Sequence, residues 1–139
     1  MRLGRLNHVG IAVSAMAEAR ARYAALFGEG AVGEPIDLPA QGVTACFVRA
    51  GDSEIELIAP LGTESPLAAF LQKAPAGGQH HLCFEVESVA EAVAALRAEG
   101  KRVLGEPRPG AHGTLVAFVH PKDMGGVLTE IMEAPDAHG

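Results

Sequence analysis

Two stretches of the chain, 73 residues apart, share one arrangement of apolar and polar positions. In the first stretch, residues 8–13 read as a strand, with Ser14 as the expected N-cap of a following helix. Apolar residues then recur at the spacing of one helix face, at Met16, Ala19, Tyr23 and Leu26. Gly28 stands where a C-cap glycine belongs. This stretch therefore predicts a strand followed by an amphipathic helix.

The second stretch repeats this pattern. Residues 81–86 read as a strand, and Ser88 with Glu91 forms the signature of a capping box. An apolar stripe follows, made of Val89, Ala92, Val93 and Leu96. Gly100 ends the predicted helix. Three further strands follow the helix in each stretch, at 34–38, 43–49 and 54–58 and again at 101–106, 114–120 and 127–131.

The order β-α-β-β-β is thus expected twice, with a short helix from Ser65-Pro66 and a linker at 74–78 in between. One such unit has a helix for only one face of its sheet. Two paired units bury more surface and form a shared cleft. We therefore expect a single α+β domain over 1–139, with module one at about 5–61, a linker helix and loop at about 65–78, and module two at about 79–133.

The composition limits the classes of function. The 139 residues are 48% apolar and 20% charged, as in one globular domain. A net charge of −6 argues against a nucleic-acid surface. No apolar stretch is long enough for a membrane span, and the N-terminus lacks a signal peptide. The two cysteines, Cys46 and Cys83, predict a reducing cytoplasm.

Each copy places one histidine at the head of its first strand and one glutamate in its last strand. The separation is 48 residues from His8 to Glu56 and 49 from His81 to Glu130. If the copies are related by a pseudo-twofold axis, two imidazoles and two carboxylates converge on one point. That set neutralises a divalent cation and suits Zn, Co, Ni, Mn or Fe. Such an ion binds a carbonyl oxygen and stabilises an enolate.

A simpler interpretation exists for each residue alone. A histidine at a strand start is usually structural, and a glutamate between apolar residues usually marks the open face of a strand. The metal hypothesis depends on the matched placement of the four residues. His80 has the opposite strand parity and is assigned outside the site, and a structural role is favoured for His120 and His138.

The chain resembles the methylmalonyl-CoA epimerases of the vicinal-oxygen-chelate superfamily, which includes glyoxalase I. The resemblance runs from Leu6 to about Glu133. It is carried by the segments Asn7–Val13, Gln41–Val43, Ile55–Leu61, Gly78–Leu82, Gly110–Gly113, His120–Asp123 and Gly126–Glu130. It implies a vicinal-oxygen-chelate (glyoxalase/bleomycin-resistance-like) fold of two tandem βαβββ modules, as a homodimer.

The resemblance also implies the chemistry. The metal ligands are His8, Glu56, His81 and Glu130 around one divalent ion (Co, Zn, Ni, Mn or Mg). The partner is an acyl-CoA substrate, whose (R) and (S) epimers are interconverted by α-proton abstraction through a metal-stabilised enolate. We expect Glu130 and Glu56 to be the catalytic carboxylates, and the identity of the second base stays open. Some members have a further glutamate after the Gln-Gly-Val stretch, whereas this chain has no carboxylate between Asp37 and Asp52.

Three alternatives share this scaffold: a glyoxalase-I-like lyase, an extradiol-type oxygenase, and a non-catalytic binding module. The loop Gly110–Gly113 is either a substrate-binding backbone loop or a plain turn. The sequence does not separate methylmalonyl-CoA from ethylmalonyl-CoA, because one methylene changes affinity by only ~1–3 kcal/mol.

Overall fold

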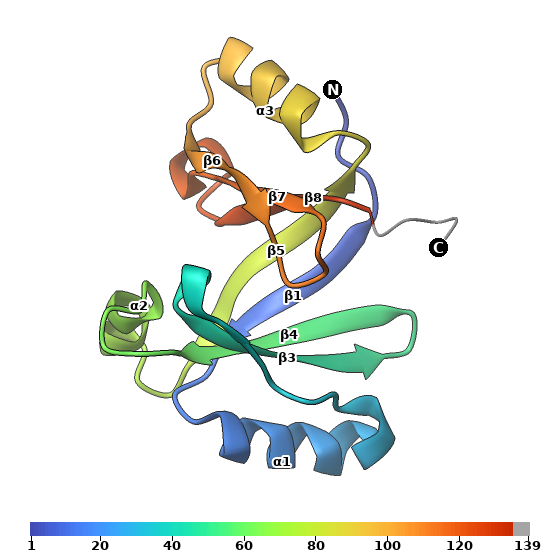
Figure 1. The fold of residues 1–139 in the computed structure, drawn as a ribbon, viewed down its shortest axis with the longest axis vertical. Helices are drawn as coiled ribbons and strands as arrows, with labels where there is room; N and C mark the ends of the chain where they lie inside the picture. Colours follow the sequence, from blue (N-terminus) through green and yellow to red (C-terminus); the bar gives the residue numbers. More distant parts are fainter. Residues whose placement is uncertain (135–139) are drawn as a thin grey trace. The chain divides into compact units, whose positions relative to one another are not determined.

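The computed structural model describes residues 1–134, and these residues form two compact units. One unit is His8–His80. The other combines Met1–Asn7 with the chain from His81 onward. Each unit holds one helix and four strands in the order β-α-β-β-β, and the His8–His80 unit has a second helix (Figure 1). The repeated order predicted from the sequence is confirmed.

The His8–His80 unit contains a sheet of order β2-β3-β4-β1. Its elements are β1 (Leu6–Ala12), α1 (Met16–Phe27), β2 (Ile36–Leu38), β3 (Val43–Ala50), β4 (Ser53–Pro60) and α2 (Leu67–Lys73), with 3₁₀ turns at Glu29–Ala31 and Pro39–Gln41. Strands β1 and β4 are parallel, and the other pairs are antiparallel.

The other unit has the same sheet pattern in the order β5-β8-β7-β6. Its elements are β5 (Gly78–Val86), α3 (Val89–Ala98), β6 (Val103–Pro109), β7 (Leu115–Val119), a 3₁₀ turn at Pro121–Asp123 and β8 (Thr129–Glu133). Strands β5 and β8 are parallel, as β1 and β4 are. The first and last strands of each copy are therefore neighbours in its sheet.

In each unit the helix of the repeat packs against one face of the sheet. Beside α1, the buried core consists of Val13, Ala19, Cys46, Val48, Leu57 and Ala59. Beside α3, it consists of Val86, Val89, Ala92, Val93, Leu96, Ala117, Val119 and Ile131. Because strand side chains alternate, the residues between these core positions point to the opposite face. In the His8–His80 unit, α2 covers part of that opposite face through Leu67.

The helix ends follow the predicted signals in part. Ser88 Oγ accepts a hydrogen bond from the Glu91 N–H at 3.1 Å, which confirms the cap of α3. Gly28 is the C-cap of α1 at φ 95°, also as predicted. The prediction of Ser14 as the N-cap of α1 is wrong. Ala15 occupies that position, and no side chain caps the helix, so the backbone begins the helix one residue later.

The first residues of the chain pair with β5. The Gly4 N–H donates to the Glu85 carbonyl at 2.8 Å, and the Glu85 N–H donates to the Arg5 carbonyl at 2.9 Å. The Glu85 carboxylate accepts hydrogen bonds from Arg5 at 3.0 Å and from Asn7 at 2.8 Å. A Cβ at Gly4 would lie 2.9 Å from the Glu85 carbonyl oxygen, so glycine is required there. The boundary between the two units thus falls within β1, after Asn7.

Two further observations bear on the compositional predictions. None of the helices formed by residues 1–134 combines the length and the apolar character of a membrane span. Among the described residues, neither Cys46 nor Cys83 forms a disulfide bond, and both side chains are buried.

An ion pair fixes the 3₁₀ turn before β8. Asp123 accepts hydrogen bonds from Arg102 through the backbone N–H at 2.8 Å, Nε at 2.9 Å and Nη2 at 3.2 Å. These bonds lower the pKa of Asp123 to about 2. The side-chain hydrogen bonds from Arg102 have the largest effect, and the backbone hydrogen bond has the next largest. The charged form of Asp123 therefore stabilises the folded chain.

We expect Asp123→Asn to lower the urea midpoint of unfolding at pH 7. A depressed carboxyl pKa contributes stability above its unfolded value of 3.8, and that contribution is lost as the pH falls toward 2. The difference between wild type and variant should therefore shrink from pH 4 to pH 2.5. Glu34→Gln is the control. Glu34 is exposed, and its ion pair with Arg20, at 3.7 Å, contributes little to stability. An equal difference at both pH values would contradict this account.

Candidate metal-binding site

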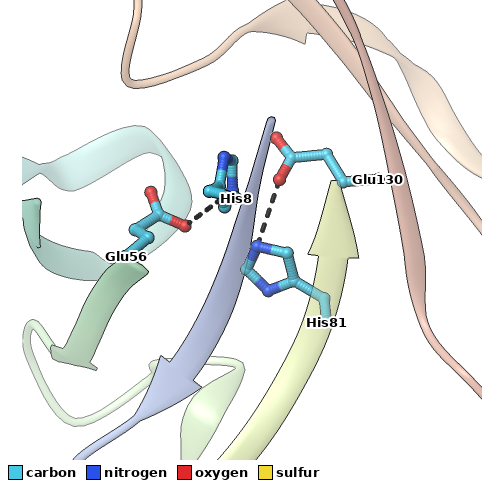
Figure 2. Close-up of side chains that lie close together, drawn as sticks. All are labelled: His8, Glu56, His81 and Glu130. Carbon is cyan, nitrogen blue, oxygen red and sulfur yellow. Dashed lines mark ion pairs between the residues drawn. The ribbon is translucent and has the colours of Figure 1, made fainter. Parts of the chain in front are cut away.

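The first histidine and glutamate of the repeat meet in the His8–His80 unit. In the parallel pair of β1 and β4, Gly10 lies opposite Glu56, and His8 stands two residues before Gly10. The period of two puts His8 and Glu56 on the same face of the sheet. His8 Nε2 lies 3.4 Å from Glu56 Oε1 (Figure 2). The exposed fractions are 3% for His8 and 7% for Glu56, so the pair is buried.

The second histidine and glutamate meet in the same way in the other unit. Cys83 of β5 lies opposite Glu130 of β8, and His81 stands two residues before Cys83. His81 Nε2 is 3.1 Å from Glu130 Oε1 (Figure 2). Both residues are again buried, at 3% and 8% exposed. The two copies of the repeat therefore build the same imidazole–carboxylate pair from the same strand positions.

A phenylalanine completes each pair. Phe47 lies opposite Glu56 on the neighbouring strand, and its ring meets the His8 ring edge to face at 6.1 Å between centroids. Phe118 lies opposite Glu130 and meets the His81 ring at 5.8 Å in the same geometry. These contacts fix the planes of the imidazoles. The sequence analysis did not assign these rings to the site. The signal for them is the dipeptide Phe-Val, which occurs at 47–48 in the first copy of the repeat and at 118–119 in the second.

The chemistry of each pair suits a cation. A buried carboxylate is costly unless a positive charge or hydrogen bonds compensate it. Each pair offers one imidazole nitrogen and one carboxylate oxygen, the donor types that divalent transition metals bind. His8, Glu56, His81 and Glu130 are the candidate ligands among the described residues.

The antiparallel neighbour β3 adds no acid to the face of Glu56. Val43, Ala45 and Phe47 share that face, since Phe47 lies opposite Glu56. Thr44 points to the other face, and its hydroxyl donates to Asp37 at 2.9 Å. The further glutamate found in some family members therefore has no substitute on β3.

Two other histidines, His80 and His120, have local structural contacts. The His80 ring packs against Phe70 of α2 at 5.2 Å. His120 Nδ1 accepts a hydrogen bond from the Lys122 N–H at 3.1 Å and caps the 3₁₀ turn. His138 lies outside the described residues. The loop Gly110–Gly113 closes on itself, with the Gly113 N–H donating to the Gly110 carbonyl at 2.9 Å.

Comparison with known proteins adds independent information. The model of the Glyoxalase/Bleomycin resistance protein/Dioxygenase superfamily matches residues 7–118. The chain is 50% identical over 131 residues to ethylmalonyl-CoA/methylmalonyl-CoA epimerase of Cereibacter sphaeroides, which covers 93% of this chain and 97% of that protein. It is 49% identical over 133 residues to mitochondrial methylmalonyl-CoA epimerase of Bos taurus. This match covers 95% of this chain and 75% of that protein.

The chain is also similar to solved structures of methylmalonyl-CoA epimerases. A methylmalonyl-CoA epimerase in complex with methylmalonyl-CoA and NH4+ has a TM-score of 0.87 and 32% identity, with 97% of each chain covered. A variant of Streptomyces coelicolor methylmalonyl-CoA epimerase in complex with 2-nitronate-propionyl-CoA has a TM-score of 0.87 and 33% identity, with 97% of each chain covered.

The two histidines should contribute alike to metal affinity, because they occupy matched positions. We expect Co²⁺ or Zn²⁺ to raise the melting temperature of chelator-treated wild-type protein. At a metal concentration of a hundred times Kd, the free energy of unfolding should increase by about 2.7 kcal/mol. His8→Ala and His81→Ala should each lose most of that gain. His120→Ala is the matched control and should keep it. A full gain in His81→Ala, measured by differential scanning calorimetry, would remove His81 from the ligand set.

Proposed function

The chain belongs to the Glyoxalase/Bleomycin resistance protein/Dioxygenase superfamily, and we propose that it is an epimerase that interconverts the (R) and (S) forms of methylmalonyl-CoA. The membership confirms the fold class and the resemblance predicted from the sequence. The observation that carries the proposal is the identity of 50% with a relative named for this activity, over 97% of that relative's length.

We propose that His8, Glu56, His81 and Glu130 hold one divalent ion (Co, Zn, Ni, Mn or Mg). Two neutral imidazoles and two carboxylates carry a charge of −2, which a divalent cation neutralises. The burial of all four side chains supports this assignment, since it leaves two carboxylates in need of a positive charge. When bound, such an ion supplies Lewis acidity that polarises the thioester carbonyl and makes the α-proton more acidic.

The proton transfers are assigned to Glu56 and Glu130. Inversion at the α-carbon needs proton removal on one side of the carbon and delivery on the other, which two carboxylates from two copies of a repeat can provide. A carboxylate that binds a cation through one oxygen keeps the other oxygen for the proton. The edge contacts with Phe47 and Phe118 support this role, because they orient the imidazoles that lie beside the two carboxylates.

The assembly and compartment are also proposals. We assign the protein to the cytoplasm as a homodimer. The two buried cysteines, which form no disulfide bond in the described part of the chain, support a reducing compartment. The homodimer rests on the family resemblance.

Ethylmalonyl-CoA is a second candidate substrate, because the Cereibacter sphaeroides relative is named for both epimerisations. A pocket that accepts one additional methylene changes binding by only ~1–3 kcal/mol. The lyase, oxygenase and binding-module alternatives are not favoured, because the relatives described above are epimerases at about half identity.

We expect the metal-loaded protein to exchange the α-hydrogen of methylmalonyl-CoA for deuterium in D2O, followed by ¹H NMR. A chelator should abolish the exchange, and adding back a divalent ion should restore it. Ethylmalonyl-CoA in a parallel sample measures the second substrate. Absence of metal-dependent exchange with both thioesters would remove the epimerase assignment.

Replacing one proposed base should separate exchange from inversion. Glu56→Gln retains an oxygen ligand but cannot take a proton, so epimerisation should fall by about 10²–10⁴-fold. Deuterium exchange should then persist for one pure epimer and fail for the other, and Glu130→Gln should show the opposite preference. Glu18→Gln, at an exposed position of α1, is the control. Near-normal epimerisation by Glu56→Gln with its metal retained would exclude Glu56 as a base.

A further inference from the structure

An arginine lies on the same sheet face as the His81–Glu130 pair. Arg108 of β6 lies opposite Val116 of β7, so both side chains point to one face. Phe118, two residues after Val116, shares that face. The Arg108 guanidinium carbon lies 5.7 Å from the centroid of the Phe118 ring, which is a cation–π contact. Arg108 itself is exposed.

An irregularity in β6 produces this placement. Leu104 pairs with Phe118, and Arg108 pairs with Val116. Between these two pairs, β6 advances by four residues and β7 by two. The additional residues form a bulge, in which Gly105 has a φ of 75° that favours glycine. Because the bulge adds an even number of residues, Leu104 and Arg108 remain on the same face of the sheet. The bulge therefore leaves the arginine facing the ring.

The Phe118 ring connects Arg108 to the candidate metal ligands. It lies opposite Glu130 in the sheet and contacts the His81 ring at 5.8 Å. The guanidinium is thus one aromatic ring away from the imidazole, and each of the two steps is shorter than 6 Å.

The charge environment of Arg108 differs from that of other arginines in the chain. Carboxylates lie within ion-pair distance of Arg5, Arg20, Arg97 and Arg102. Arg108 instead rests on an aromatic face, which orients a guanidinium but does not neutralise its charge. In a chain with a net charge of −6, such a group is a local site for an anion.

We propose that Arg108 binds the free carboxylate of the acyl-CoA substrate and thereby selects malonyl-type thioesters over thioesters without that carboxylate. This inference rests on the proposed function. A guanidinium matches a carboxylate with two parallel N–H donors. The substrate also carries phosphates, but these lie at the far end of the pantetheine arm from the thioester. Arg108 and His81 contact the same Phe118 ring, and this shared contact beside the candidate metal ligands favours the carboxylate.

Binding of two thioesters to metal-loaded protein tests the inference. Methylmalonyl-CoA carries the carboxylate, and propionyl-CoA is the same thioester without it. For Arg108→Met we expect the Kd of methylmalonyl-CoA, measured by calorimetry, to rise roughly tenfold to a hundredfold. The Kd of propionyl-CoA should change by less than about twofold. Arg108→Lys should recover part of the loss, and Arg22→Met on α1 is the control for the lost charge.

The outcomes are distinct. Equal weakening of both thioesters would place Arg108 at the CoA phosphates and overturn the carboxylate assignment. Unchanged binding of both in a folded Arg108→Met or Arg108→Gln variant would overturn the contact itself. In the steady state, Arg108→Met should raise KM more than it lowers kcat. Failure of the wild type to exchange the α-hydrogen would instead refute the proposed function, while the binding difference would still decide the role of Arg108.

Discussion

The pairing of a histidine and a glutamate across two parallel strands is the constraint on which the candidate site depends. In both units the first strand of the repeat lies next to the last, and the glutamate stands opposite the residue two positions after the histidine. This register, together with the two-residue period of a strand, directs both side chains to one face. A shift by one residue would turn each glutamate into the helix-covered core.

The helices determine which face remains available for polar side chains. Apolar residues of alternate parity pack under α1 and α3, and the histidines and glutamates have the other parity. Burial of the apolar face therefore holds the register that the polar face needs. The phenylalanines belong to the same arrangement, because Phe47 and Phe118 sit across from Glu56 and Glu130 on the neighbouring strand. Stability and the candidate chemistry thus use opposite faces of the same strands.

The two copies of the repeat differ where their surroundings differ. In the His8–His80 unit, α2 covers part of the polar face through Leu67, and β3 is regular along its length. In the other unit, the bulge of β6 presents Arg108 on that face. A duplicated scaffold can therefore keep a matched pair of ligands and still offer an asymmetric substrate two different environments.

The sequence alone determined the repeated β-α-β-β-β order, the amphipathic helices and the residue types of both pairs, because apolar periodicity and glycine or serine caps are local signals. It failed at the start of α1, where no side chain caps the helix, and it did not assign Phe47, Phe118 or Arg108. Those positions depend on which strands are neighbours and in what register, and on the length of a bulge that Gly105 alone does not determine. Only the tertiary structure decided them, since pairing between residues distant in the chain is set by packing of the whole sheet rather than by neighbouring residues.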